Sequence, residues 1–163
     1  MIRQAEYKDI EPILVIINKA IEDLKQRNID QWQNGYPNQE RIEEDIYTNK
    51  AYVLQENQLL GYMYVDEYEA TYDQIDGHWL NAQPYYVIHR FVVDMDERGK
   101  GLAYQLLDYV EEMAKKNQRD IRVDTHFDNL AMQAFLNKHG FKDCGIITLT
   151  DGSLRKAYQK WIK

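Results

Sequence analysis

Two glycines alternate with two basic residues in the segment Arg98-Gly99-Lys100-Gly101, which follows an apolar run and precedes an amphipathic one. The two flanking patterns predict a strand and a helix. Backbone N–H groups at a helix start lack intrahelical acceptors and carry part of the positive end of the helix dipole. Glycine lets a phosphate approach the backbone, and the basic side chains add positive charge. The segment is therefore a candidate pyrophosphate site, and a plain glycine-rich turn is the alternative.

Two common nucleotide-binding motifs do not fit this segment. The ATP-binding P-loop places serine or threonine after its lysine to hold magnesium, whereas Gly101 follows Lys100 here. The dinucleotide fingerprint requires glycine or alanine where this chain has Tyr104. The segment therefore belongs to neither of these two classes.

His89 is a candidate general base within an apolar, β-branched run. Side chains alternate along a strand, so Val87, His89 and Phe91 share one face if no bulge intervenes. Histidine is the side chain best suited to exchanging a proton near neutral pH. Glu67 and Tyr68 compete for this role, and a structural histidine bonded to a neighbouring strand is the alternative for His89.

Other polar residues do not define a site. Two loop clusters lack the spacing of a metal site, so we expect solvated side chains and no metal; they are Asp94, Asp96 and Glu97, and Asp124, His126 and Asp128. Cys144, the only cysteine, has no Cys-His-Asp arrangement near it in the sequence and is expected to pack.

The elements that position these residues follow from hydrophobic periodicity. Asp9 is expected to cap a first helix, and a second helix is expected to begin at Asn38. Residues 70–84 are predicted to form a surface loop. The remaining predicted elements are a short strand at 2–5, a hairpin turning at 56–58, a central strand at 85–93, a helix from 102, a strand at 121–125, a helix ending at Gly140 and a hairpin turning at 150–153.

Length and charge limit the class of protein. A chain of 163 residues suits a single domain spanning 1–163. Its net charge of −7 argues against a broad nucleic-acid surface and mildly favours a cationic substrate. The N-terminal segment lacks the apolar stretch of a signal peptide, and no run approaches the ~20 apolar residues of a membrane span. We expect a cytoplasmic protein without nucleic-acid or membrane partners; a homodimer is compatible with the sequence.

Residues 98–103 match the Gln/Arg-x-x-Gly-x-Gly/Ala signature of GNAT acetyltransferases, and the chain resembles that family. The order of predicted elements agrees with the family over nearly the whole chain. Asn129 and the segment ending in Gly140 and Phe141 resemble a second family pattern. The resemblance implies an α/β (α+β) GNAT fold, with a mixed central sheet of about 6–7 strands flanked by about four helices.

The resemblance implies transfer of acetyl from acetyl-CoA to a small-molecule or peptide amine, by direct attack in a ternary complex. In such proteins the pyrophosphate lies on the loop amides and the pantetheine lies along the fourth strand. By the same resemblance Asn129 contacts the pantetheine arm. The implied cofactor-binding residues are Phe91, Val92, Val93, Arg98, Gly99, Lys100, Gly101, Leu102, Ala103, Asn129 and Phe135.

The resemblance also raises alternatives. Trp32 and Tyr36 lie where the superfamily generally builds its acceptor pocket. The alternative for Trp32 is that its side chain packs in the core under the loop. Leu136 stands where the family often has a proton-donating tyrosine. A catalytically silent acetyl-CoA-binding sensor is therefore the alternative function, and a phosphate- or nucleotide-binding protein of another fold is a second one.

Overall fold

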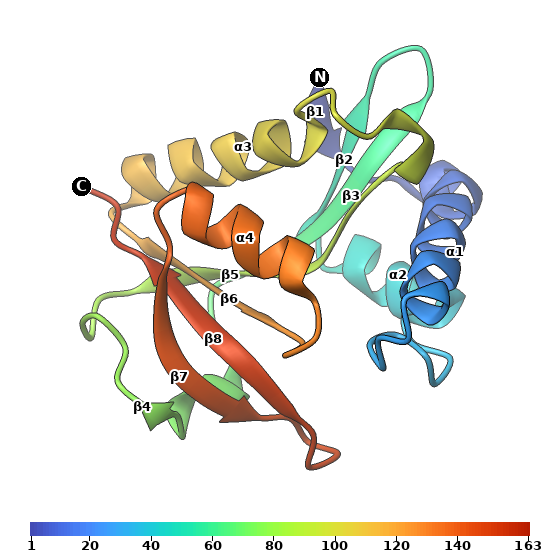
Figure 1. Cartoon of the computed structure of the whole chain (residues 1–163). Coiled ribbons are helices and arrows are strands. Elements are labelled where there is room, and N and C mark those ends of the chain that lie inside the picture. The colour runs from blue at the N-terminus through green and yellow to red at the C-terminus, as the bar shows by residue number, and fades with distance from the viewer. The chain divides into compact units, whose positions relative to one another are not determined.

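The chain contains eight strands and four α-helices, which the computed structural model describes over residues 1–163 (Figure 1). The strand order is β1-β2-β3-β5-β6-β8-β7-β4. This mixed α/β architecture confirms the predicted fold class, with one strand more than expected. The elements are β1 (Ile2–Gln4), α1 (Ile10–Gln26), α2 (Gln39–Tyr47), β2 (Ala51–Gln55), β3 (Leu59–Asp66), β4 (Asp76–Gly77), β5 (Tyr85–Val93), α3 (Leu102–Asn117), β6 (Asp120–Thr125), α4 (Leu130–Lys138), β7 (Lys142–Thr148) and β8 (Leu154–Lys160).

The chain forms two compact units, and both β5 and α3 contribute residues to each of them. The first unit comprises Met1–Val65 and His89–Val110. The second comprises Asp66–Ile88 and Glu111–Lys163. The glycine loop, the end of β5 and the α1–α2 connection therefore belong to the first unit.

The core of the first unit forms between helices α1 and α2 and strands β2 and β3 (Figure 1). The helices present apolar residues at helical spacing, and β2 presents alternate residues to the same core, as expected from the two periodicities. These buried residues include Ile13, Ile16, Ile17 and Ala20 of α1, Ile42 and Ile46 of α2, Ala51 and Val53 of β2, and Tyr62 of β3.

The two helices begin differently. Helix α2 begins where it was predicted, and Asn38 caps it, because its side chain accepts a hydrogen bond of 3.0 Å from the backbone N–H of Arg41. Asp9 precedes α1 but does not cap it through its side chain. Its carboxylate instead accepts two hydrogen bonds of 2.8 Å from Arg3 and one from the backbone N–H of Glu6. Asp9 thus stabilises the short 3-10 turn Tyr7–Asp9 that leads into the helix.

In the second unit, β6 pairs in parallel with β5 and antiparallel with β8, and β7 and β8 form the closing hairpin. The predicted surface loop at 70–84 is more ordered than expected. It contains a 3-10 turn and the short strand β4, which pairs with β7. Tyr72 is only 1% exposed, and its hydroxyl donates to Asp124 at 2.6 Å. The surface-loop prediction was therefore wrong for Tyr72, because the polar composition of the segment gave no sign that one of its aromatic residues enters the core.

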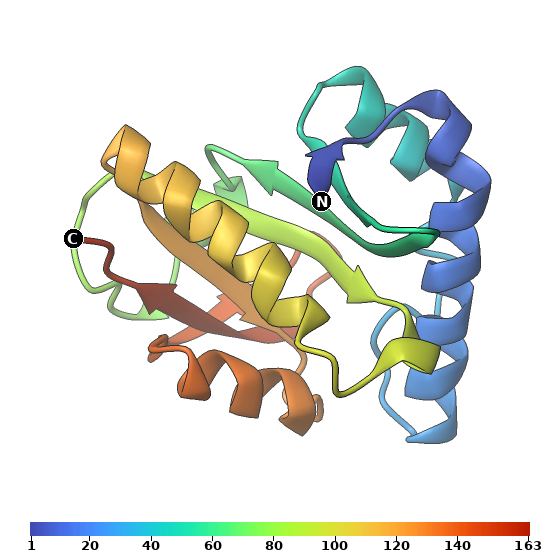
Figure 2. The ribbon, with the colours of Figure 1, turned by 90° about the horizontal axis from the view of Figure 1, so that it is seen from above.

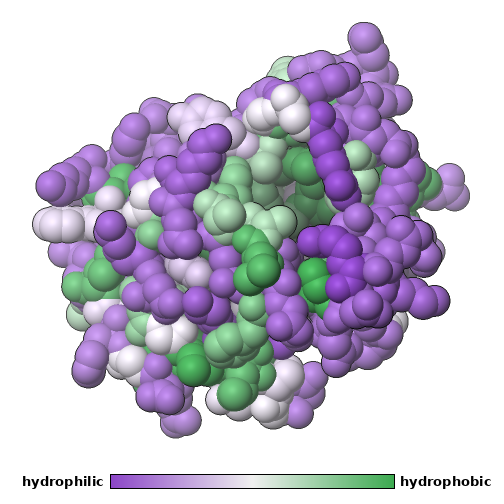
Figure 3. All heavy atoms as spheres, in the orientation of Figure 1, coloured by the Kyte–Doolittle hydropathy of each residue, from purple (hydrophilic) through white to green (hydrophobic).

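Hydrophilic side chains predominate on the face that Figure 3 shows, and apolar ones gather in smaller areas between them. This distribution agrees with a chain in which 29% of the residues are charged. No helix combines the length and the apolar character needed to cross a bilayer.

Candidate active site

The glycine loop lies between a 3-10 turn, Met95–Glu97, and the start of α3 (Figure 2). Gly99 and Gly101 have φ angles of 81° and 72°, which side chains other than glycine rarely adopt. An added Cβ at either position would meet no atom within 4 Å. Glycine is therefore required by the backbone conformation and not by crowding, and the space above the loop is open to a ligand.

Helix α3 starts at this loop, since the N–H of Gln105 donates to the carbonyl of Gly101 at 3.1 Å. The backbone N–H groups of the first helical turn have no acceptor within the helix. An anion bound there meets N–H donors and the positive end of the dipole together. The loop therefore fits the pyrophosphate that the sequence predicted for it.

Both basic side chains of the loop already have carboxylate partners. Arg98 contacts Asp23 of α1 at 2.8 Å, and Lys100 contacts Glu97. The side chains of Arg98 and Lys100 are 59% and 65% exposed, and ion pairs exposed to this degree contribute little to stability. A phosphate can therefore replace either carboxylate at small cost.

Strand β5 is irregular at Arg90, whose φ of 51° lies outside the β region. The sequence argument assumed that no bulge separates His89 from Phe91, and this condition is not met. Val92 is buried in the core of the first unit, whereas Phe91 and Val93 are half-buried. Phe91 and Val93 therefore offer more surface to a ligand than Val92 does.

Arg90 is the centre of a buried polar network in the first unit. Its Nε and Nη2 donate to the two carboxylate oxygens of Asp45 at 2.7 and 2.6 Å. Its Nη1 donates to the hydroxyl of Tyr36 at 2.6 Å. The hydroxyl of Tyr62 donates to Asp45 at 2.6 Å, and the ring of Tyr64 lies 4.6 Å from the guanidinium. The network connects α2, β3, β5 and the α1–α2 loop.

The protonation of this network is strongly biased. Burial alone would lower the pKa of Arg90, but the hydrogen bonds and charges of Asp45 and Tyr36 outweigh it and raise the pKa. Burial, followed by the charge of Asp45, raises the pKa of Tyr62 well above its ordinary value. Arg90 therefore stays charged and Tyr62 stays neutral at any working pH, so the network positions groups and does not exchange protons.

Sequence reasoning missed Arg90 and Asp45. The one available signal was an arginine inside an otherwise apolar strand, because a buried charge requires a partner. Nothing in the pattern of α2 indicated that Asp45 would be that partner, since Asp45 lies among several acidic residues of the same helix.

The two candidate bases belong to different units. His89 is half-buried, and its ring stacks on that of Tyr64 with 6.3 Å between centroids. Glu67 is exposed in the second unit and lies 3.5 Å from Arg119. Its neighbour Tyr68 donates a hydrogen bond to Asp73. His89 therefore belongs to the same unit as the glycine loop. Glu67 belongs to the other unit, where its carboxylate forms an ion pair with Arg119.

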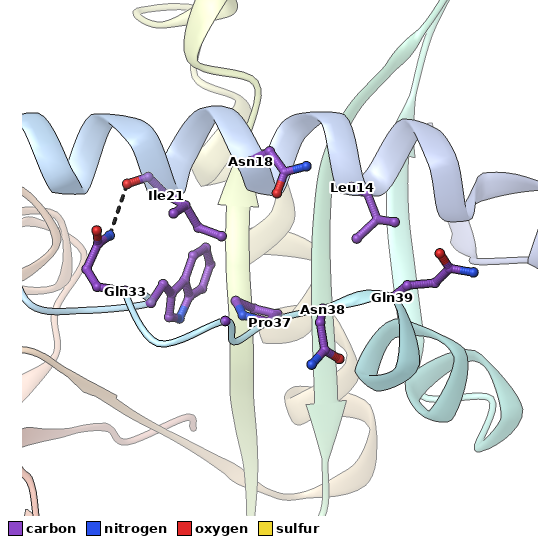
Figure 4. Close-up of a pocket in the computed structure, with 9 residues that line it drawn as sticks. Leu14, Asn18, Ile21, Gln33, Pro37, Asn38 and Gln39 are labelled. Atoms are coloured by element: carbon purple, nitrogen blue, oxygen red, sulfur yellow. Dashed lines mark hydrogen bonds between the residues drawn. The ribbon is translucent and has the colours of Figure 1, made fainter.

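The α1–α2 connection forms one wall of a pocket of about 370 Å³, and α1 forms the opposite wall (Figure 4). This volume lies at the small end of the range for ligand pockets, about 300–1,000 Å³. Apolar residues and carboxamide residues line the pocket together with Gly35. The apolar residues are Leu14, Ile21, Trp32 and Pro37, and the carboxamide residues are Asn18, Gln33, Asn38 and Gln39.

The two residues predicted to bind the acceptor occupy different places. Trp32 lines the pocket and also packs against the core of the first unit, as the alternative interpretation of this residue expected. Tyr36 is half-buried and does not line the pocket. Its hydroxyl accepts a hydrogen bond from Arg90, so Tyr36 connects the α1–α2 connection to β5.

Leu102 and Ala103 begin α3 in the first unit, and Asn129, Phe135, Leu136 and Cys144 lie in the second unit. Asn129 caps α4 by accepting a hydrogen bond of 3.2 Å from the N–H of Met132, and the ring of Phe135 packs on that of His139. Leu136 is 1% exposed. Cys144 is buried, which raises the pKa of its thiol. No three or more His, Cys, Asp or Glu side chains gather as metal ligands would.

The mixed sheet, with a glycine loop that ends at the start of α3, agrees with the acyltransferase fold that the resemblance implied. The sequence model described as the acetyltransferase (GNAT) family matches residues 17–141. The chain therefore belongs to the GNAT acetyltransferase family and is an acyltransferase.

Solved structures agree with this assignment. A GNAT-family acetyltransferase from Streptococcus agalactiae 2603 is 38% identical, with a TM-score of 0.90 over 100% of this chain and 95% of that one. An acetyltransferase from Staphylococcus aureus Mu50 is 32% identical, with a TM-score of 0.76 over 100% of this chain and 99% of that one. No curated protein sequence matches the chain.

Proposed function

We propose that residues 1–163 form a single-domain N-acetyltransferase, which transfers acetyl from acetyl-CoA to an amine in a ternary complex. The observation that carries this proposal is the open glycine loop at the start of α3, with two glycines at positive φ and two exposed basic side chains beside them. The absence of a membrane-spanning helix and the net charge of −7 favour a cytoplasmic protein without membrane or nucleic-acid partners.

Several parts of the chain would hold the donor. The amides of residues 98–103 bind the pyrophosphate, and Arg98 and Lys100 neutralise its charge. The backbone of Phe91 and Val93 hydrogen-bonds the pantetheine arm. Asn129 and Phe135, in the second unit, are proposed as further contacts. Bound acetyl-CoA supplies an activated acetyl group.

The acceptor must lose a proton before its nitrogen can attack. An amine with a lysine-like pKa of about 10.4 is mostly protonated at pH 7, and its neutral form is disfavoured by about 4 to 5 kcal/mol. We assign this proton to His89, because it is half-buried in the middle of β5 and belongs to the unit that holds the glycine loop. Glu67 is the alternative base.

The neutral nitrogen then forms a bond to the acetyl carbon while the carbon–sulfur bond breaks and the thiolate leaves, and the nitrogen releases its second proton to solvent. Leu136 has no proton to donate to the leaving sulfur. A free thiol has a pKa of about 8.5, so a thiolate leaves without a strong acid near neutral pH. The leucine therefore does not prevent turnover.

The experiment is thiol release from acetyl-CoA with a panel of amines, accompanied by calorimetric binding of coenzyme A and of ATP. We expect amine-dependent thiol release and a preference for coenzyme A. Tight cofactor binding with no release for any amine would support a silent sensor instead. Comparable binding of ATP and coenzyme A would contradict the assignment of the loop.

A further inference from the structure

Arg90 lies between two residues with proposed roles, since His89 precedes it as the base and Phe91 follows it in the backbone that binds the donor. The backbone angles of Arg90 therefore set how these two groups are oriented. We infer that Arg90 is a positioning residue, whose ion pair with Asp45 holds β5 in a left-handed conformation and thereby fixes the orientation of His89 relative to the donor. This inference rests on the proposed function and adds a residue to it.

The conformation of Arg90 is unusual for a residue inside a strand. The residues other than glycine with positive φ are Asn28, Trp32, Asn49, Arg90 and Gln118. The others lie in connections between elements, whereas Arg90 lies within β5 with a φ of 51°. A side chain disfavours this region, because its Cβ crowds the following carbonyl. Contacts elsewhere in the fold must therefore hold Arg90 in this conformation.

The ion pair with Asp45 supplies these contacts. The side chains of Arg90 and Asp45 are only 6% and 1% exposed, and their two hydrogen bonds match the planar guanidinium to both carboxylate oxygens. Neither side chain can turn away, because it would leave a buried charge without a partner. A change in the backbone of Arg90 would pull the guanidinium out of this geometry. The ion pair therefore opposes such a change.

Two tyrosines of β3 connect the ion pair to its surroundings. The oxygen of Asp45 that accepts from the Nε of Arg90 also accepts from the hydroxyl of Tyr62, which is buried in the core of the first unit. The ring of Tyr64 lies 4.6 Å from the guanidinium, and its centroid lies 6.3 Å from that of the His89 ring. Tyr62 therefore holds the carboxylate in place, and Tyr64 contacts both Arg90 and the proposed base.

Beyond this point β5 packs closely on β3. The N–H of Asp94 donates to the carbonyl of Leu60 at 2.8 Å. A Cβ added to Gly61 would lie 3.3 Å from the carbonyl oxygen of Val92, so the two backbones leave little room for a shift. The donor-binding end of β5 therefore keeps its place on β3. A changed φ within the strand would instead displace the residues before it, and His89 is the nearest of these.

The first test keeps the charge of Arg90 and changes its shape. In Arg90→Lys the ammonium still neutralises Asp45, but it cannot bond both carboxylate oxygens in one plane. We expect kcat with the best amine of the panel to fall by about 100-fold, because a misplacement of about 1 Å can cost that much. The KM for the amine should change much less.

Arg155→Lys is the matched control, since the guanidinium of Arg155 in β8 donates to the carbonyl of its neighbour Leu154 at 2.8 Å. This variant should retain the parent rate. Thermal unfolding of both variants shows whether they fold. A folded Arg90→Lys with the kcat of the parent overturns the inference.

The second test separates the backbone conformation from the charges. Both Asp45→Asn/Arg90→Gly and Asp45→Asn/Arg90→Ala lack the ion pair, but only glycine adopts positive φ readily. We expect the glycine variant to turn over about tenfold faster than the alanine variant, because it can restore the orientation of His89. The same two substitutions at Arg155, which lacks positive φ, should give glycine no advantage. Equal rates of the two double variants contradict the inference.

The Cε1–H NMR signal of His89, assigned with His89→Gln, separates this inference from the proposed function. The signal depends on the stacking of the imidazole on Tyr64, so it reports the position of His89 without turnover. It should match the parent in the glycine double variant and move in the alanine double variant.

If the parent releases thiol with no amine, the proposed function fails, and this pattern of signals alone decides whether Arg90 positions His89. If the parent is active and both double variants agree in rate and signal, the proposed function stands and the inference fails. If neither double variant folds, Arg90→Lys decides, since an unmoved His89 signal in that variant overturns the inference.

Discussion

The Nη1 atom of Arg90 donates a hydrogen bond of 2.6 Å to the hydroxyl of Tyr36, although 54 residues separate them in the chain. Arg90 occupies the irregular point of β5, and Tyr36 belongs to the connection that lines the pocket. This bond therefore ties the α1–α2 connection to the strand that carries His89.

Tyr36→Phe should lower the free energy of unfolding by about 1–3 kcal/mol, because it removes a hydrogen-bond partner from a buried cation. It should also raise KM for the acceptor more than it changes coenzyme A affinity. Urea unfolding and initial-rate kinetics measure these effects. Tyr47→Phe is the control, since Tyr47 is 80% exposed. Equal stabilities of the two variants would show that the bond to Arg90 contributes nothing.

Gly101→Glu should abolish the stabilisation by coenzyme A, which amounts to about 2.7 kcal/mol at one hundred times the dissociation constant. The new side chain occupies phosphate space and repels the phosphate. Gly152→Glu is the matched control, because Gly152 also has positive φ, at 88°, and open space around it in the β7–β8 turn. Both variants should lose similar intrinsic stability in thermal unfolding, and only Gly101→Glu should lose the response to ligand.

Arg98→Ala and Asp23→Asn should change coenzyme A affinity in opposite directions. The first removes a positive charge from the loop, and the second removes the carboxylate that now contacts Arg98. Both effects should shrink as salt rises, since salt screens exposed charges. Calorimetry at low and high salt measures this. A loss in Arg98→Ala that does not depend on salt would indicate misfolding instead.

His89→Gln should lower kcat/KM by about 100-fold or more, because glutamine retains hydrogen bonding but cannot accept the proton of the amine. Coenzyme A affinity should remain nearly unchanged, and the acidic limb of the pH profile should disappear. Glu67→Gln provides the comparison. If His89→Gln retains both its rate and its pH profile while Glu67→Gln does not, Glu67 is the base.

Asp9 should contribute to the loss of stability in acid. Burial alone would raise the pKa of Asp9, but the hydrogen bonds from Arg3 and from the N–H of Glu6 outweigh this and lower it. The folded state thus binds this proton less readily than the unfolded state, whose aspartate pKa is about 3.9. The stabilisation is complete well above pH 4 and is lost as pH falls through 4 towards the lower folded-state pKa.

Urea unfolding between about pH 3 and 6 measures this contribution, since a single aspartate titrates over that interval. Asp9→Asn should flatten the decline of stability with falling pH. Glu11→Gln, at an exposed position of α1, should not. An equally steep decline in Asp9→Asn would assign the acid sensitivity to other carboxylates.

The sequence alone determined the parts of this protein that depend on local interactions. Helical spacing defined α1 and its buried face, and Asn38 marked the start of α2, because a helix requires only its own apolar stripe and cap. The glycines at 99 and 101 likewise predicted an anion-binding loop, because the ability to adopt a positive φ depends on the residue itself and not on distant contacts.

The tertiary structure decided which distant residues meet. Asp9 bonds Arg3 and does not cap α1, and Tyr72 enters the core from a polar segment. Arg90 leaves the β conformation and contacts Asp45 and Tyr36. A buried charge must be neutralised, but the residue that neutralises it is set by how α2, β5 and the α1–α2 connection pack, and no period in the sequence encodes that packing.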